Sequence, residues 1–279
     1  MDKNTIITLI LIPIGVTIVS SGILAFFKWI KPTMVDNHLF VKEITKLNDK
    51  DINAFIQLYN RRINEEIRIC AEQIVGFIDP NPLDEITHHL YVCKHSNEVV
   101  GFVKIIVSHK NNYLFIAYIA IDEHDSLAIK DGVHSMITKL IRKHLRGRNK
   151  VSNLFTEIER GSNNGYVTSL YKSIARRSRS FNFNAYVVDF DYIQPNMPDD
   201  SYQETNEKIL SLIWIPCNES FQNSLSKTDV IKICKNIYED IYLPSCNCSN
   251  DCSSYVNYLD SLYARYENNL PPIINVIPM

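Results

Sequence analysis

The chain has 279 residues, of which 46% are hydrophobic and 22% are charged, and this is the composition of a globular protein with one or two domains. Its 29 Lys and Arg residues against 31 Asp and Glu residues give a net charge of −2, so the basic excess typical of nucleic-acid-binding proteins is missing and no nucleic-acid partner is expected. With 8 glycines, 11 prolines and no repeat of fixed period, the sequence excludes collagen-like and solenoid proteins.

The chain opens on a long apolar segment, because no charged residue occurs between Lys3 and Lys28. A helix over Thr5–Ile30 can cross the ~30 Å hydrocarbon core of a bilayer, which takes about 20 apolar residues. A cleaved signal peptide is the alternative, but the run exceeds the usual ~7–15 apolar residues and no small-x-small site follows it. We therefore expect residues 1–31 to form a transmembrane anchor.

Positive charges next to this segment predict its orientation. Lys28 and Lys31, then Lys42 and Lys46, follow the segment, whereas only Lys3 and the α-amine precede it. We therefore expect a single-pass membrane protein whose C-terminal domain faces the cytosol. The seven cysteines point the same way, because their odd number and irregular spacing fit a reducing compartment better than a disulfide framework.

The next part of the chain predicts a strand, two helices and an antiparallel meander. Leu39–Thr45 is rich in β-branched and aromatic residues, as strands are. Apolar spacing predicts helices over Asp51–Ile63 and Ile69–Phe77. Three strand-like runs joined by short polar links follow, and they are His89–His95, Glu98–Ser108 and Tyr113–Asp122.

Helices and strands then alternate, and two amphipathic helices end the pattern. The predicted elements are a helix over Leu127–Leu145, a strand over Asn153–Glu159, a helix over Asn164–Arg177, strands over Asn184–Ile193 and Ile209–Pro216, and helices over Lys227–Tyr242 and Cys252–Tyr263. No element is assigned to the closing segment PPIINVIPM.

This order of elements resembles the fold of the GNAT N-acetyltransferases over about Leu39–Cys217, and EVVGFVKI (Glu98–Ile105) looks like that family's third strand with its hairpin exit. The expected fold class is thus α/β (α+β), with a GNAT-like mixed central sheet flanked by helices. The expected domains are the transmembrane anchor at 1–31, the GNAT-like domain at 32–218 and a small helical extension with a cysteine-bearing loop at 219–279.

The segment YIAIDEHDSLAIKDGVHSMITKLI (Tyr118–Ile141) is similar to the strand, pyrophosphate loop and helix that hold acetyl-CoA in that family. Backbone amides and the helix dipole at such a loop favour an anion. Gly132 matches the first glycine of the pattern Q/R-x-x-G-x-G/A, but Ile129 and His134 depart from it. The resemblance implies acetyl-CoA as co-substrate, held by Ile119, Ala120, Ile121, Lys130, Asp131, Gly132, Val133 and His134. An amphipathic helix with an ordinary polar loop is the alternative.

A third segment, NNGYVTSLYKS (Asn163–Ser173), resembles the family motif N-x-x-A-x-x-L/F-Y, with Val167 in place of Ala. The resemblance implies that Asn164 contacts the cofactor and that Tyr171 protonates the departing sulfur as a general acid. The Gly-Phe pair that usually follows is missing. A half-buried helix aromatic is the alternative for Tyr171.

The segments FDYIQPNM (Phe190–Met197) and ILSLIWIPCN (Ile209–Asn218) look like the terminal hairpin of a bacterial subset of the family with a Y-x-Q-P turn. In that subset a Glu-x-Glu pair lies on the preceding strand, where Glu157 and Glu159 stand here. Strand alternation puts both on one face, and the resemblance implies that Glu157 is the base for an attacking amine. A solvated strand end is the alternative.

Cys246, Cys248 and Cys252 could supply three soft ligands to a metal or form a redox-active thiol pair, but no fourth ligand is evident. We therefore assign no metal and expect an unligated polar loop. The basic cluster Lys139–Lys150 could meet a CoA phosphate or anionic lipid, or be a solvated helix face.

Two functions remain open on these residues. The first is a membrane-anchored acyl-CoA-dependent N-acyltransferase that acts on an amine, either a small molecule or a protein, which the sequence does not identify. The second is a catalytically degenerate GNAT-like sensing or scaffold module, because Ile129 and His134 depart from the cofactor pattern.

Overall fold

A computed structural model describes residues 38–63, 69–78, 84–148, 150–159, 165–196, 207–217, 223–246 and 252–279. The transmembrane anchor expected over residues 1–31 lies outside this part of the chain, so it stays a prediction. Among the described residues, no helix combines the length and the apolar character needed to cross a membrane.

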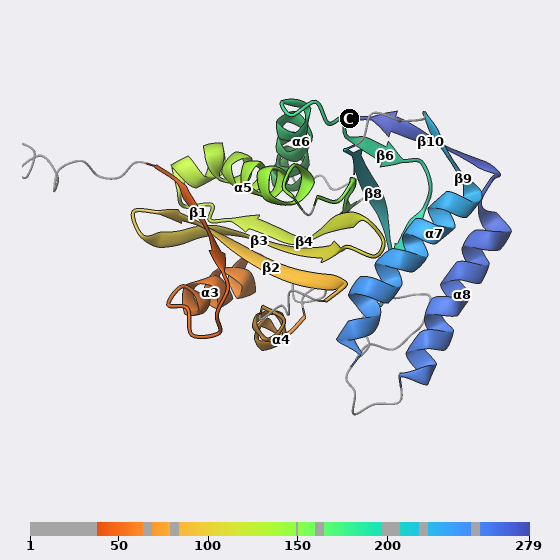
Figure 1. The fold of residues 1–279 in the computed structure, drawn as a ribbon, viewed down its shortest axis with the longest axis horizontal. Helices are drawn as coiled ribbons and strands as arrows, with labels where there is room; N and C mark the ends of the chain where they lie inside the picture. Colours follow the sequence, from red (N-terminus) through yellow and green to blue (C-terminus); the bar gives the residue numbers. More distant parts are fainter. Residues whose placement is uncertain are drawn as a thin grey trace, which may run out of the picture. The chain divides into compact units, whose positions relative to one another are not determined.

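The described residues are organised around one mixed β-sheet of ten strands (Figure 1). The hairpin between its second and third strands turns at Ser96 and Asn97, whose φ angles of 49° and 72° are left-handed. Two successive left-handed residues match the twist of the flanking strands, so a two-residue link suffices. The predicted antiparallel meander of three strands is confirmed as β2 (Ile86–His95), β3 (Glu98–Ser108) and β4 (Tyr113–Ile121). The first predicted strand, β1 (Phe40–Ile44), pairs antiparallel with β2.

The sheet continues from β4 by a parallel pairing with β5 (Asn153–Glu159), and β8 (Lys208–Pro216) runs antiparallel to β5. The single strand predicted over Asn184–Ile193 is divided into β6 (Tyr186–Val188) and β7 (Tyr192–Gln194), which pair with different parts of β8. A tight bend separates β6 from β7, because the Phe190 N–H donates to the Val188 carbonyl only two residues earlier.

Helices cover both faces of the meander (Figure 1). On one face, α3 (Ile52–Arg62) and α4 (Ala71–Gly76) pack apolar side chains such as Phe55 and Ile74 onto the strands. On the other face, α6 (Gly165–Arg179) packs against α5 (Val133–Leu140). π-Helical turns at Ala128–Gly132 and Ile141–Leu145 extend α5 at both ends, so the helix predicted over Leu127–Leu145 is present.

The last part of the chain contributes strands as well as the two predicted helices. α7 (Lys227–Ile237) begins at a capping box between Ser226 and Asp229, and α8 (Ser253–Asn269) is longer than predicted. The closing segment, to which the sequence analysis assigns no element, forms β10 (Ile273–Pro278). β10 pairs with β6 and with the short β9 (Ser224–Ser226), and so covers a sheet edge that would otherwise be open.

A disulfide joins Cys246 to Cys252, and it closes the loop between the π-helical turn Tyr238–Tyr242 and α8. The sequence predicts an unligated polar loop here. The structure differs from that prediction, because the side chains of Cys246 and Cys252 lie close enough to form a bond. Cys248 lies outside the described residues. Within the part of the chain that the structure describes, no group of three His, Cys, Asp or Glu side chains is arranged to hold a metal.

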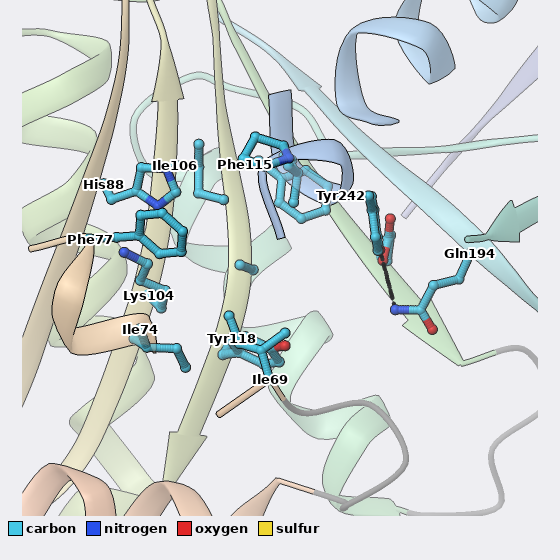
Figure 2. A pocket seen from close by; sticks show the side chains of 14 residues that line it. Ile69, Ile74, Phe77, His88, Lys104, Ile106, Phe115, Tyr118, Gln194 and Tyr242 are labelled. Atoms are coloured by element: carbon cyan, nitrogen blue, oxygen red, sulfur yellow. Dashed lines mark hydrogen bonds between the residues drawn. The ribbon is translucent and has the colours of Figure 1, made fainter. Parts of the chain in front are cut away.

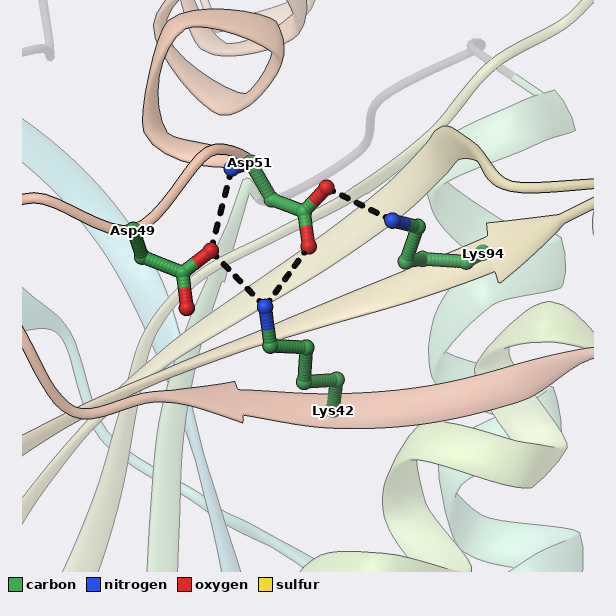
Figure 3. Close-up of polar contacts among 4 residues, drawn as sticks. All are labelled: Lys42, Asp49, Asp51 and Lys94. Carbon is green, nitrogen blue, oxygen red and sulfur yellow. Dashed lines mark hydrogen bonds and ion pairs between the residues drawn. The ribbon is translucent and has the colours of Figure 1, made fainter.

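A cluster of four charged side chains fixes α3 to β1 and β2 (Figure 3). Asp51, which is only 5% exposed, accepts a hydrogen bond of 2.6 Å from the buried Lys94 and one of 2.9 Å from Lys42. Lys42 also donates to Asp49 at 2.7 Å. Burial alone would raise the pKa of Asp51, but the hydrogen bonds from Lys94 and Lys42 outweigh it and lower this pKa.

We predict that Asp51→Asn lowers the free energy of unfolding by about 3 kcal/mol at pH 7, because it leaves Lys94 buried without its anionic partner. The pKa of Asp51 is lower in the folded state, so its contribution is present above about pH 4 and is lost as the pH falls through the folded-state pKa. Urea denaturation between pH 3 and 7 measures both effects. Asp49→Asn is the matched control, because Lys42 can still donate to Asp51 in that variant. An equal loss of unfolding free energy in the two variants would contradict this account.

Candidate active site

The centre of the sheet contains a gap where β4 and β5 separate. Their parallel ladder begins at Tyr113–Asn153 and ends at Ile116–Thr156. At the same level β4 carries a β-bulge, in which Ala117 is the extra residue between the partners of Lys104 and Ile105 on β3. Bulges bend a strand and terminate pairing. Beyond this point β4 stays paired with β3, and β5 stays paired with β8.

Glu157 is the first residue of β5 beyond the last rung, and three side chains donate hydrogen bonds to its carboxylate. Tyr192 donates to Oε1. Tyr242 donates to Oε2 at 2.7 Å, and Gln194 Nε2 lies 3.4 Å from the same oxygen. Gln194 Nε2 also donates to the Tyr242 hydroxyl at 3.2 Å, so the group is tied together (Figure 2).

Two of these partners belong to the Y-x-Q-P segment that the sequence analysis singles out, although it gives them no role. Tyr242 comes from the C-terminal part of the chain, and no sequence signal connects it with Glu157. Burial raises the pKa of Glu157 to about 7, and the hydrogen bonds from Tyr192 and Tyr242 limit the rise. The carboxyl group therefore exchanges a proton near neutral pH.

Glu157 lines a pocket on the face of the sheet that carries α3 and α4 (Figure 2). The apolar wall includes Ile74 and Phe77 from the α4 region and Ile106 and Phe115 from the strands. The polar side chains in the lining are His88, Lys104, Tyr118, Glu157, Gln194 and Tyr242. The sequence analysis identifies only Glu157 among them as functional; Lys104 stands alone in the apolar run of β3, and this was the signal that could have drawn attention to it.

Tyr171 lies on α6, and its hydroxyl donates a hydrogen bond of 2.8 Å to the backbone carbonyl of Glu157. Tyr171 packs with the core on the α5 and α6 side of the sheet, whereas the Glu157 carboxylate faces the pocket. The structure thus brings the two residues predicted as catalytic to one point of β5 from opposite faces. Glu159 is exposed, and it is not part of the pocket lining.

The residues predicted to hold a cofactor fall into two groups. Ile119, Ala120 and Ile121 are buried in β4 beyond the bulge, alongside the gap. The other group lies on the helix and not in a loop, because the chain is helical from Ser126 onward. Lys130 and His134 are exposed there, Asp131 is half-buried, and Gly132 and Val133 are buried. Asn164 lies outside the described residues.

Gly132 has a helical backbone and packs against β4. A Cβ atom at this position would lie 3.3 Å from the Ile121 side chain, so the glycine permits close contact between helix and strand. Gly132 is predicted to lie in a phosphate-binding loop, but in the structure it lies in the second turn of the helix.

The start of this helix already holds a carboxylate. Asp125 accepts a hydrogen bond of 2.7 Å from the Ala128 N–H, as an N-cap does, and a second one of 2.5 Å joins it to His95 Nδ1. The preceding acidic residues are also paired, Asp122 with Arg61 and Glu123 with Arg62. The anion that the helix dipole favours here is thus supplied by the chain itself.

Comparison of the sequence with protein-family models and with curated proteins gave no match. Among solved structures, a protein from Bacteroides thetaiotaomicron assigned to the GNAT acetyltransferases matches with a TM-score of 0.50 and 14% identity, over 73% of this chain and 98% of that one. An acetyltransferase structure from Salmonella typhimurium with its cofactor acetyl-CoA matches with a TM-score of 0.43 and 14% identity, over 66% of this chain and 97% of that one.

An N-acetyltransferase from Staphylococcus aureus matches with a TM-score of 0.38 and 12% identity, over 64% of this chain and 98% of that one. At these identities a likeness concerns the arrangement of the backbone. The match to the Bacteroides protein covers 98% of that protein, so it extends over nearly the whole of its fold. The chain therefore has the GNAT acetyltransferase fold.

Proposed function

We propose that this chain is an acetyl-CoA-dependent N-acyltransferase in which Glu157 accepts the proton of the attacking amine. The observation that carries the proposal is the position of Glu157: a carboxyl group with a pKa of about 7, held by three donors, at the point where β4 and β5 part in a GNAT fold. The Bacteroides protein with the same fold is described as an acetyltransferase, which supports acyl transfer as the reaction.

The chemistry requires a base, because an alkylamine with a pKa of roughly 10 is protonated at neutral pH and cannot attack in that form. A carboxylate with a pKa near the working pH combines a useful ionised fraction with the ability to take the proton. Tyr192 holds Oε1 of Glu157, and Tyr242 and Gln194 hold Oε2. A carboxylate can accept about four hydrogen bonds, so capacity for the substrate remains.

The gap beside β4 fits the acyl-bearing arm of the cofactor. When bound, acetyl-CoA would supply a thioester whose carbonyl carbon the amine attacks. The backbone of Ile119–Ile121 lies along the gap, where an extended arm can pair with it as a further strand would. Tyr171 Oη donates to the backbone carbonyl of Glu157 at 2.8 Å, and we assign Tyr171 the role of the acid that would protonate the departing sulfur.

The nucleotide end of the cofactor fits less well. Asp125 caps the helix at which family members are expected to hold the pyrophosphate, and a second anion there would meet like charge. Lys130 and His134 are exposed ionisable side chains near the start of this helix, and phosphates could approach them instead. The poor fit between Asp125 and a pyrophosphate is the observation that favours a second candidate function. In this alternative, the chain keeps the GNAT fold as a sensing or scaffold module and does not bind the cofactor productively.

Membrane attachment through residues 1–31, with the domain in the cytosol, remains part of the proposal. Its support is the uncharged run between Lys3 and Lys28 and the positive charges that follow. The disulfide between Cys246 and Cys252 favours the opposite orientation, with the domain outside the cytosol, because such bonds persist in oxidising compartments. A labelling experiment separates the two orientations.

We expect Glu157→Gln to lower kcat/KM for acetyl transfer by roughly 10²-fold or more, since the amide cannot accept the proton. In the parent, kcat/KM should rise with pH to a plateau above about pH 7, because only ionised Glu157 is a base. Steady-state kinetics between pH 5.5 and 9 measures both. Glu159→Gln, on the same strand but exposed, is the control; if it lost as much activity as Glu157→Gln, or if Glu157→Gln kept the parent's profile, Glu157 would not be the base.

The fit of the nucleotide can be tested at Asp125. Asp125→Ser keeps an N-cap oxygen but removes the negative charge, so acetyl-CoA should bind at least fivefold more tightly, while pantetheine, which lacks the nucleotide, should be unaffected. Calorimetry on the full chain measures both ligands, and Glu123→Gln is the control for general surface charge. If neither the parent nor Asp125→Ser binds acetyl-CoA, the sensing or scaffold module becomes the better account.

The exposed thiol of Cys70 reports the orientation of the domain. A membrane-impermeant maleimide should label Cys70 only after lysis, and a Cys70→Ser variant supplies the background. The full chain should also stay with membranes through a carbonate wash. Labelling in intact cells would place the domain outside the cytosol, and release by carbonate would remove the anchor.

A further inference from the structure

Lys104 is a buried lysine that forms no ion pair within the described part of the chain. It lies on β3, is 3% exposed and lines the pocket that contains Glu157. Its Nζ atom has no hydrogen-bond partner among the described residues. Lys94, on the neighbouring strand β2, is also buried, but its Nζ atom forms an ion pair with Asp51 at 2.6 Å.

A lysine in this position is unfavourable for the protein alone. A buried charge costs free energy unless it is paired, and a neutral amine would still leave its hydrogen-bonding groups unsatisfied. Burial lowers the pKa of Lys104 to about 7, and no carboxylate of the described residues opposes that shift. An anion that entered the pocket would supply the missing partner.

His88 presents a second unsatisfied polar atom at the same end of the pocket. Its Nδ1 is buried and has no hydrogen-bond partner in the part of the chain that the structure describes. The ring stacks on Phe77, with centroids 4.7 Å apart, which fixes its orientation. Burial, with help from the charge of Lys104, lowers the pKa of His88 to about 3, so the imidazole is neutral and can donate one hydrogen bond.

These two side chains face Glu157 across the pocket. In Figure 2, Lys104 and His88 lie near Phe77 at one side of the view, whereas Tyr242 and Gln194, the partners of Glu157, lie at the other. Lys104 pairs with Tyr118 on β4, and the strand that carries Glu157, β5, lies on the other side of β4. Ile106 and Phe115 provide apolar wall in the same lining.

We propose that Lys104 and His88 form an anion subsite, and that the acceptor is therefore a small amine that also carries a carboxylate, with an apolar body between the two groups. The identity of the acceptor rests on the proposed function; the anion subsite does not. The acceptor's carboxylate receives charge-assisted hydrogen bonds from Lys104 and a hydrogen bond from His88, while its amine reaches Glu157. Polyamines fit this pocket poorly, because a second ammonium would meet Lys104.

The subsite is tested first by binding, without turnover. Straight-chain carboxylates from butanoate to octanoate and their amides are titrated into the full-length chain by calorimetry. We expect the best carboxylate to bind at least tenfold more tightly than its amide, and Lys104→Met to abolish this difference. Lys94→Met, which removes a paired buried lysine, should lower stability but keep the difference.

Proton uptake gives a second readout of the same contact. The titratable groups that line the pocket with Lys104 are His88, Glu157, Tyr118 and Tyr242. At pH 8.5 His88 and the tyrosines are neutral and Glu157 is ionised, so Lys104 is the group that gains a proton when a carboxylate arrives. Calorimetry in buffers of different ionisation enthalpy should show uptake approaching one proton in the parent and none in Lys104→Met.

Failure of the anion subsite and failure of the proposed acyltransferase function give different results in these experiments. If carboxylates bind through Lys104 but no amine is acetylated, the subsite stands and the acyltransferase proposal falls. If carboxylates and amides bind equally, or Lys104→Met keeps the preference while folded, the subsite is wrong. Lys104→Met should fold at least as stably as the parent, because it removes an unpaired buried charge. Stable acetylation of Lys104 in the parent, seen by mass spectrometry, would also overturn the proposal.

With acetyl-CoA present, 6-aminohexanoate should be acetylated with a kcat/KM at least tenfold above that of its amide and of spermidine. Lys104→Met should lose that preference mainly through KM, since Lys104 binds the acceptor and does not take part in proton transfer. A preference for spermidine would contradict an anionic acceptor.

Discussion

Two neighbouring parallel strands that stop pairing halfway determine the arrangement of this molecule. β4 and β5 share four rungs, and the Thr156 hydroxyl, which donates to the Ile116 carbonyl at 3.2 Å, marks the last of them. Each strand then keeps its other neighbour, so the sheet stays continuous at both sides while a gap opens between them. The bulge at Ala117 bends β4 away at this level. Glu157 is the next residue of β5, so it has no partner on β4, although it still pairs with Leu212 on β8. Its carboxylate lines the pocket.

The surroundings of Glu157 depend on parts of the chain that are far apart. Tyr192 and Gln194 reach it from the short strand β7, whose backbone is held by two buried tyrosines. Tyr266 on α8 accepts a hydrogen bond of 2.7 Å from the Ile193 N–H, and Tyr238 donates to the Ile193 carbonyl. Tyr242 follows Tyr238 by one helical turn and donates to Glu157 itself. The C-terminal helices thus position the site and raise the pKa of its base by excluding water.

The sequence predicts the meander, the long helix and most strands because their apolar periodicity is strong, and the family resemblance places Glu157 and Tyr171 at one point. It does not reveal β10, whose buried Ile274 and Val276 alternate over only a few residues between prolines. Tyr242 and Lys104 were missed for a different reason: a helix aromatic and a single lysine in a strand acquire meaning only from side chains that are distant in sequence. The N-cap role of Asp125 could not be predicted either, because it depends on the backbone geometry at the start of the helix.

A crystal structure of the full chain with acetyl-CoA tests the central claim most directly, because that claim is the use of the gap between β4 and β5. The account predicts that the pantetheine arm lies between Ile119–Ile121 and β5, with the acetyl group at the Glu157 end and Tyr171 beside the sulfur. A cofactor bound elsewhere, or a crystal grown at saturating acetyl-CoA in which the gap holds no ligand, would contradict it.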